Sequence, residues 1–142
     1  MKVKELMSWP VIQIAPTETV AVAARTLTHY NIGAVPVCAS DGKLCGMVTD
    51  RDMVTRCLAA GKDPEKTKVA DVMTGTVITA RPDMKAAEAA DIMGAKQVRR
   101  LPVVENGKLC GIVSLGDLAV NKKSDASAGA ALSQISSNIS VR

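Results

Sequence analysis

The hydrophobic positions of the chain predict two helices. Apolar residues recur in two separate stretches at the i, i+3, i+4 and i+7 spacing that one buried face of a helix requires. The first set is Val20, Ala23, Ala24, Leu27 and Tyr30. The second set is Ala86, Ala89, Ala90 and Met93. We therefore expect one amphipathic helix in each half of the chain.

Short apolar runs around these helices predict strands. Val11–Ile14 and Val77–Thr79 lie just before a proline, which is typical of a strand that ends in a turn. After each helix the chain has two further apolar runs, which we interpret as a pair of strands. These runs are AVPV at 34–37 with LCGMV at 44–48, and LPVV at 101–104 with LCGIV at 109–113.

A short turn should join the two strands of each pair. Asp41-Gly42 separates the first pair and Asn106-Gly107 separates the second. Asn-Gly and Asp-Gly are the sequences that a two-residue type I′ hairpin turn prefers, because both turn residues need positive φ angles. A final helix is expected to begin at Thr49 in the first half and at Ser114 in the second.

The order of elements occurs twice because the chain contains an internal duplication. DGKLCGMVTDRD at 41–52 and NGKLCGIVSLGD at 106–117 are identical at seven of twelve positions. The match extends to the start of each copy, where VKELM at 3–7 corresponds to VADVM at 69–73. A unit of about 55 residues buries its apolar face poorly when alone, so we expect the two copies to pack on each other.

The predicted fold class is α+β or α/β, with two β-α-β-β-α repeats packed about a pseudo-twofold axis. Each repeat is expected to form a small three-stranded sheet with its helices on one side. The expected divisions are a first repeat at 1–60, a polar linker at 61–68, a second repeat at 69–123 and a flexible Ser/Ala-rich tail at 124–142.

Composition and charge narrow the function classes. The net charge is +4 without any run of Lys or Arg, and the chain has no Phe, one Trp and one Tyr, which disfavours a nucleic-acid partner. Neither a signal-peptide pattern nor 18 consecutive apolar residues occur, so we expect a cytoplasmic protein without a membrane partner. The four cysteines form no CxxC and have only His29 as a further soft ligand, so we expect no metal site.

The shared stretch ends in a pattern that can cap a helix. Thr49 and Asp52 in the first copy, and Ser114 and Asp117 in the second, place a hydroxyl three residues before a carboxylate. In a capping box the hydroxyl accepts a hydrogen bond from a first-turn N–H, and the acid complements the helix dipole. Capping explains these pairs without a ligand, but it does not explain why the preceding strand and turn are repeated with them.

The whole arrangement resembles a tandem cystathionine-β-synthase (CBS) domain pair, also called a Bateman module, of the stand-alone prokaryotic type. The resemblance covers residues 3–121 and rests on the duplication, the V-P-V or L-P-V-V strand, and the G-h-V-[T/S]-x-x-D end, where h is apolar. It implies a site for adenosine-containing molecules in a cleft between the copies. AMP, ADP, ATP, NADH and S-adenosylmethionine are all ligands of this kind, and the sequence does not choose among them or between one cleft and two.

The resemblance also implies a role for individual residues. Asp52 and Asp117 would accept hydrogen bonds from ribose hydroxyls, and the phosphate side would be formed by Thr49, Ser114, Arg99, Arg100 and Arg51. The adenine pocket would be formed by Ala15, Val20, Ile32, Gly33, Ala34, Arg81, Ala86 and Val98. Arginine suits phosphate because its rigid fork can bind two oxygens at once. The alternatives are a solvated surface doublet for Arg99–Arg100 and simple charge balance for Arg51.

Two functions from different classes follow. The first is a regulatory, energy-sensing module that binds an adenosine nucleotide and signals to an unknown regulated protein or through its homodimer. The second is a ligand-free scaffold for protein interaction or dimerisation. An enzyme is disfavoured, since one His supplies no usual proton shuttle and no P-loop occurs. We expect no required cofactor, although Mg²⁺ can accompany a triphosphate.

Overall fold

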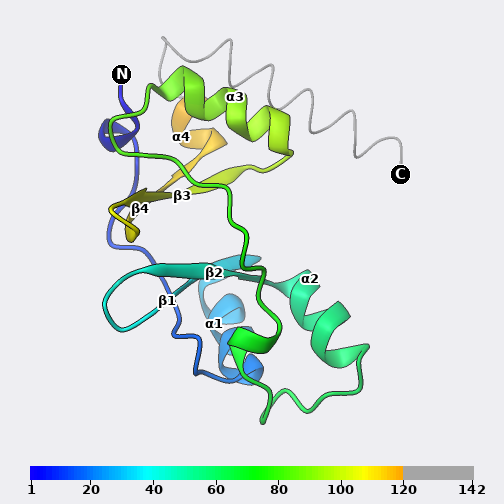
Figure 1. The fold of residues 1–142 in the computed structure, drawn as a ribbon. Helices are drawn as coiled ribbons and strands as arrows, with labels where there is room; N and C mark the ends of the chain where they lie inside the picture. Colours follow the sequence, from blue (N-terminus) through cyan, green and yellow to red (C-terminus); the bar gives the residue numbers. More distant parts are fainter. Residues whose placement is uncertain (120–142) are drawn as a thin grey trace, which may run out of the picture. The chain divides into compact units, whose positions relative to one another are not determined.

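The computed structural model describes residues 1–119, so the tail expected at 124–142 lies outside the described residues. The chain divides into two compact units. Unit 1 combines Met1–Val11 with Ile78–Arg142, and unit 2 is Ile12–Val77. Each unit contains one hairpin with its own helices (Figure 1).

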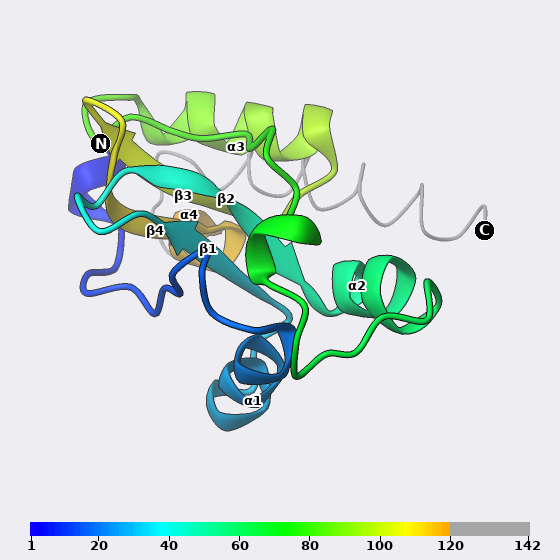
Figure 2. The same cartoon turned by 60° about the horizontal axis from the view of Figure 1, so that its bottom comes forward.

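Unit 2 is built on the antiparallel hairpin of β1 (Ala34–Cys38) and β2 (Leu44–Thr49). Helix α1 (Val20–Tyr30) precedes it, and α2 (Asp50–Met53) follows and continues as a π-helix, η2 (Val54–Leu58). Figure 2 shows β2 running directly into α2. The buried core of the unit consists of Ile14, Val20, Ala23, Leu27, Val35, Val37, Val48, Cys57, Val69 and Val72.

Unit 1 repeats this plan with the antiparallel hairpin of β3 (Arg100–Glu105) and β4 (Lys108–Ser114). Helices α3 (Ala86–Lys96) and α4 (Leu115–Ala119) lie on one side of it (Figure 1). The buried core consists of Val3, Ala80, Met84, Ala86, Ala89, Ala90, Met93, Leu101, Val103, Val113, Leu115 and Leu118. The helix faces predicted from apolar spacing supply residues to both cores, which confirms the mixed α and β fold class.

The units do not follow the two sequence repeats, because the repeats exchange their first segments. The 3-10 helix η1 (Val3–Glu5) belongs to the first repeat but packs in unit 1, and η3 (Val69–Asp71) begins the second repeat but packs in unit 2. Ser8 exchanges two backbone hydrogen bonds with Ile112 of β4, at 2.8 and 3.1 Å. Thr74 does the same with Met47 of β2, at 3.0 and 2.8 Å.

Two glycines of the repeated stretch allow these segments to approach. A β-carbon at Gly46 would lie 2.5 Å from the carbonyl oxygen of Thr74. A β-carbon at Gly111 would lie 2.7 Å from the sulfur of Met7 and 3.1 Å from the Ser8 carbonyl oxygen. Real β-carbons are essentially never found within 3.0 Å of a backbone oxygen, so close packing requires glycine at position 46, while at Gly111 the flexible Met7 side chain would have to move. This accounts for part of the repeated sequence without any ligand.

The expected first strand of each repeat is reduced to a single bridge. Ile14 pairs in parallel with Val37, and Ala80 pairs with Val103. The Ile14 N–H donates to Pro36 and its carbonyl accepts from Cys38. The next bond of a parallel ladder would need an N–H on the residue before Val37, which is Pro36 and has none. The expectation of three-stranded sheets was therefore wrong, because each sheet has two strands extended by isolated bridges.

Only one of the two turns has the expected form. Asn106-Gly107 directly connects β3 to β4, and both residues have positive φ, 54° and 79°, as a type I′ turn requires. In the other hairpin Gly42 has positive φ but Asp41 does not. The first loop is longer, since residues 39–43 separate its strands, and Asp41 stabilises it by accepting a hydrogen bond from the Lys43 N–H at 3.0 Å.

The cysteine of each GKLCG stretch is the extra residue of a β-bulge. Val37 pairs with Gly46 and Cys38 pairs with Leu44, so Cys45 between them has no partner. In the second hairpin Val103 pairs with Gly111 and Val104 pairs with Leu109, which leaves Cys110 without a partner in the ladder. Both bulged cysteines are half-buried, and the Cys110 thiol lies 3.3 Å from the Val103 carbonyl oxygen. The repeated stretch thus encodes a turn, a bulge and a site of close packing in succession.

The four thiols should differ in reactivity. Burial, with a smaller contribution from nearby Cys45, raises the pKa of Cys38 from 9.0 to about 11. Its thiol therefore resists ionisation, and the stability that this neutral thiol contributes is present below pH 9 and lost as the pH rises through about 11. At pH 8 we expect iodoacetamide to modify Cys38 at least about tenfold more slowly in the native than in the urea-unfolded chain, because the thiolate is the nucleophile. Mass spectrometry of peptides checks this, and equal rates in the two states would contradict it.

Candidate functional site

The end of β2 and the start of α2 form the first candidate site. Thr49 is the last residue of β2 and the N-cap of α2. Its hydroxyl accepts a hydrogen bond from the Asp52 N–H at 3.0 Å, and the Asp52 Oδ2 accepts from the Thr49 N–H at 3.1 Å. The capping box expected from the sequence is therefore present. Such a cap stabilises a helix by about 1 kcal/mol.

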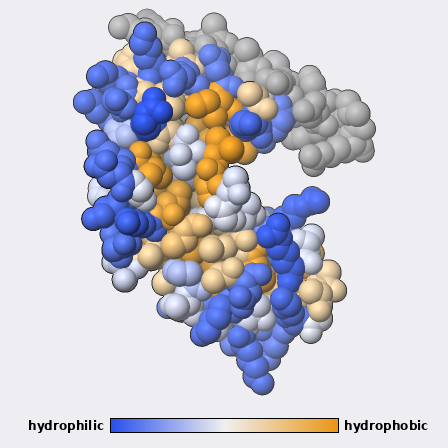
Figure 3. Space-filling view, in the orientation of Figure 1, coloured by the Kyte–Doolittle hydropathy of each residue, from blue (hydrophilic) through white to orange (hydrophobic). Residues whose placement is uncertain are grey.

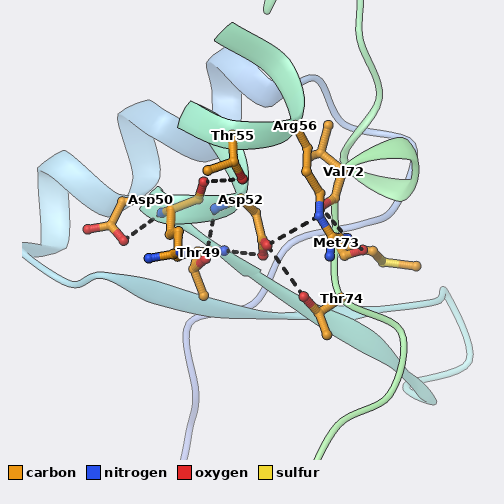
Figure 4. Close-up of polar contacts among 9 residues, drawn as sticks. Thr49, Asp50, Asp52, Thr55, Arg56, Val72, Met73 and Thr74 are labelled. Atoms are coloured by element: carbon orange, nitrogen blue, oxygen red, sulfur yellow. Dashed lines mark hydrogen bonds and ion pairs between the residues drawn. The ribbon is translucent and has the colours of Figure 1, made fainter. Parts of the chain in front are cut away.

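Asp52 has further partners that the sequence did not predict. Its Oδ1 accepts from the Thr74 hydroxyl at 3.4 Å and lies 3.8 Å from the Nε of Arg56 (Figure 4). Arg56 also donates through Nη1 to the carbonyl oxygens of Val72 and Met73, at 3.4 and 3.1 Å. Asp52 is consequently buried, with 8% of its surface exposed. The carboxylate and Arg56 together fasten the exchanged segment around Thr74 to the first hairpin.

The end of β4 and the start of α4 form the corresponding site in unit 1. The Asp117 N–H donates to the Ser114 hydroxyl at 3.1 Å, and Asp117 Oδ2 accepts from the Ser114 N–H at 2.9 Å. Asp117 is half-buried and so more accessible than Asp52. Within residues 1–119, its Oδ1 has no hydrogen-bond or ion-pair partner.

The strand opposite each cap differs between the units. Arg100 is the cross-strand neighbour of Ser114, and the Arg99 carbonyl oxygen accepts from the Leu115 N–H at 2.8 Å, so both arginines lie at the α4 end of the hairpin. Both are exposed. In unit 2 the equivalent residues are Gly33 and Ala34, and Ala34 pairs with Thr49. The carboxylate of Asp50 lies over Gly33, where a β-carbon would be 3.5 Å from Oδ2.

The residues proposed for the adenine pocket are only partly accessible. Val20 and Ala86 lie in the two cores, with 2% and 3% of their surfaces exposed. Their side chains therefore contribute to packing within the units. The others retain accessible surface: Ala15, Ile32, Ala34 and Val98 are half-buried, and Gly33 and Arg81 are exposed. Arg51 is also exposed, and its backbone N–H is bonded to the Asp50 carboxylate at 2.8 Å.

Arg56 and Thr74 are the residues of this region that the sequence reasoning missed. The spacing of Asp52 and Arg56 is i, i+4, which favours an ion pair on a helix. This spacing in the sequence could have predicted the ion pair. Thr74 matches Ser8 at an offset of 66, but the exchange of segments that brings it to Asp52 is not visible in the sequence.

The described residues offer no metal-binding cluster or membrane span. Within residues 1–119, no group of three His, Cys, Asp or Glu side chains is placed to hold a metal ion. The same part of the chain has no helix that is long and apolar enough to cross a bilayer. The side chains of the two candidate sites offer hydroxyl, carboxylate and guanidinium groups.

Comparison with known proteins identifies the architecture. The model of the CBS domain family matches residues 3–59 and again residues 69–121. The chain belongs to the CBS domain family. A CBS domain-containing protein of Bacillus subtilis, YhcV, is 43% identical over 134 residues, which cover 94% of each chain. Hypoxic response protein 1 of Mycobacterium tuberculosis is 34% identical over 116 residues, 82% of this chain and 81% of the relative.

Solved structures of CBS proteins share the fold. A crystal structure of Hypoxic Response Protein I with two coordinated zinc ions matches with a TM-score of 0.78 and 33% identity, over 84% of this chain and 98% of that one. A crystal structure of CBSX2 in complex with AMP matches with a TM-score of 0.72 and 26% identity, over 82% and 91% of the two chains. The resemblance inferred from the duplicated motif is confirmed by these matches.

Proposed function

We propose that this CBS pair is a regulatory module that binds an adenosine-containing nucleotide and transmits binding to a partner protein or through a homodimer. AMP, ADP and ATP are the leading candidates, followed by NADH and S-adenosylmethionine. The observation that carries the proposal is the arrangement at each hairpin end, where a hydroxyl and a carboxylate are held 3.0–3.1 Å from each other's backbone N–H groups in the first repeat and 2.9–3.1 Å in the second. A carboxylate held in this way can accept hydrogen bonds from a ribose diol.

The AMP complex of CBSX2 supports the choice of ligand, because that protein shares this fold over most of its length. The module acts by binding and not by catalysis. Its ligand needs no resident metal, and a triphosphate would bring its own Mg²⁺.

A ligand-free scaffold is the second candidate, and one observation favours it. Val54 and Leu58 lie four residues apart on η2, with 54% and 70% of their surfaces exposed. Residues at this spacing share a helix face. Figure 3 shows hydrophobic residues, in orange, beside hydrophilic ones, in blue, on the visible face. A scaffold would use such apolar surface and would have no affinity for nucleotides.

A thermal-shift panel separates the two functions. Purified protein is melted with AMP, ADP, ATP, NADH or S-adenosylmethionine, and with GMP and GTP as controls that have the same ribose and phosphates as AMP and ATP but a different base. A ligand at 100 times its dissociation constant should stabilise the fold by about 2.7 kcal/mol, which raises the melting temperature by several degrees. We expect such a shift with at least one adenosine compound and none with the guanosine controls. A flat panel would reject the nucleotide proposal in favour of the scaffold.

A further inference from the structure

We infer that residues Met1–Ser8 are exchanged between two copies of the chain, so that this segment of one copy docks on unit 1 of the other. We call the segment the strap. The inference goes beyond the proposed nucleotide function and does not depend on it, because it concerns how a second copy of the chain is bound.

No direct covalent link joins the strap to the larger part of unit 1. That part begins at Ile78, and the whole of unit 2 lies between the two along the chain. A strap from a second copy would therefore form the same contacts. Five backbone hydrogen bonds hold the strap: Val3 N–H to Met84 O at 2.8 Å, Lys4 N–H to Pro82 O at 2.9 Å, Ala86 N–H to Met1 O at 2.8 Å, Ser8 N–H to Ile112 O at 2.8 Å and Ile112 N–H to Ser8 O at 3.1 Å.

The surface of unit 1 beneath the strap fits its side chains. Val3 has none of its surface exposed and belongs to the core of the unit, and Leu6 and Met7 pack against that core. Met7 lies over Gly111, where a β-carbon would be 2.7 Å from the Met7 sulfur. Unit 1 without its strap would expose apolar core to water, so it is expected to bind a strap from whichever copy supplies one.

The corresponding segment of the second repeat is fastened by additional side-chain contacts. Arg56 donates to the carbonyl oxygens of Val72 and Met73, and the Thr74 hydroxyl donates to Asp52. Among the described residues, the side chains of Lys2–Ser8 form no hydrogen bond or ion pair. The strap is therefore the exchanged segment that local unfolding releases more readily.

A pair of lysines favours opening of the strap. Lys2 lies directly opposite Lys85 in an antiparallel bridge, and both residues are exposed. Like charges in directly opposite positions are destabilising. The corresponding bridge of unit 2 pairs Thr19 with Lys68 and has only one charge. The lysine repulsion is the same whichever copy supplies the strap, so it speeds opening without deciding which copy then docks.

The residues after the strap favour docking on a second copy. Trp9 and Pro10 connect the strap to Val11, and both are exposed, Trp9 with 56% of its surface. In an exchanged dimer the two connecting stretches cross from one chain to the other, so each brings Trp9 to a surface of the second copy. Burial of this large apolar side chain is a gain that the monomer lacks.

Isotope mixing with a short amine cross-linker tests the exchange on the full chain. Equal amounts of unlabelled and ¹⁵N-labelled protein are concentrated together, warmed below the melting temperature, cooled and separated by size. Lys2 and Lys85 suit the cross-linker, because the β-carbons of directly opposite residues lie about 5 Å apart. Lys62 and Lys66 are the control pair, because both are exposed and lie close together along unit 2.

In the dimer fraction, about half of the Lys2–Lys85 links are expected to join chains of unlike label, because equal mixing pairs unlike chains half of the time. Lys62–Lys66 links should carry a single label throughout. Trp9 is the only tryptophan, so its fluorescence emission should shift to shorter wavelength in the dimer fraction.

Lys2→Glu tests the opening step by converting a repelling pair into an attracting one. Hydrogen exchange of the Ser8 and Ile112 amides should slow by about threefold or more. Lys4→Glu is the matched control, because Lys4 is an exposed residue of the strap that is not paired with a lysine in any bridge. Its effect should be less than about twofold. Equal rates in the two variants would overturn the opening step.

The inference is overturned if the protein stays monomeric after concentration and warming. It is also overturned if a dimer forms in which every Lys2–Lys85 link carries a single label, since that result would place the dimer contact at another surface. Neither outcome bears on nucleotide binding, which the thermal-shift panel measures independently.

Discussion

Leu101→Ala is expected to lower the free energy of unfolding by about 3 kcal/mol, within the range of about 2–5 kcal/mol typical of buried leucines. Leu101 lies in β3 with none of its surface exposed, and it packs in the core of unit 1 with residues of α3 and α4. Truncation removes apolar contacts and leaves a cavity, because the surrounding strands and helices relax only partly. Urea unfolding monitored by circular dichroism measures the change.

Leu58→Ala is the matched control for this substitution. This substitution removes the same atoms from a leucine on η2 that has 70% of its surface exposed. Its effect should stay within about 0.5 kcal/mol, as is usual for surface substitutions. Equal losses at the two positions would contradict the placement of Leu101 in a packed core.

Gly46→Ala is expected to destabilise the protein by about 2 kcal/mol, in the range of about 1–3 kcal/mol for overpacked sites. The added methyl group would meet the Thr74 carbonyl oxygen at 2.5 Å and the sulfur of Met73 at 3.0 Å. Thr74 cannot move away without weakening its two backbone hydrogen bonds to Met47, so the clash is not easily relieved. Thermal and urea unfolding measure the loss.

Two other glycines calibrate this prediction. Gly75→Ala introduces the same methyl group where no heavy atom lies within 4 Å, and we expect a change of less than about 0.5 kcal/mol. Gly111→Ala should be intermediate, because its nearest neighbour at 2.7 Å is the flexible side chain of Met7. If Gly46→Ala were as stable as Gly75→Ala, the close approach of the exchanged segment to β2 would be refuted.

Local signals in the sequence were sufficient for the helix, the hairpin and the capped second helix of each repeat, but not for its first strand, which is reduced to an isolated bridge. The helix faces were predicted from apolar spacing, the Asn106-Gly107 turn from its residue types, and both capping boxes from the spacing of Thr49–Asp52 and Ser114–Asp117. In each of these features the interacting residues are near one another along the chain, so the sequence pattern contains both partners of the interaction.

Features that depend on distant segments were not predicted. The exchange of Val3–Glu5 and Val69–Asp71 between the repeats requires contacts across most of a repeat. It brings the Thr74 hydroxyl to within 3.4 Å of Asp52 Oδ1, and Asp52 is buried. The missing N–H of Pro36 could have been used, because it excludes a longer parallel ladder with the run at 11–14.

Nuclear magnetic resonance mapping of AMP binding tests the central claim most directly. At 142 residues the chain is small enough for assignment of its backbone amide signals, which report the binding site residue by residue. The account predicts saturable shifts concentrated at the hairpin ends, in residues 49–52, 98–100 and 114–117. A spectrum that does not change at millimolar AMP, or shifts confined to residues far from both hairpin ends, would contradict it.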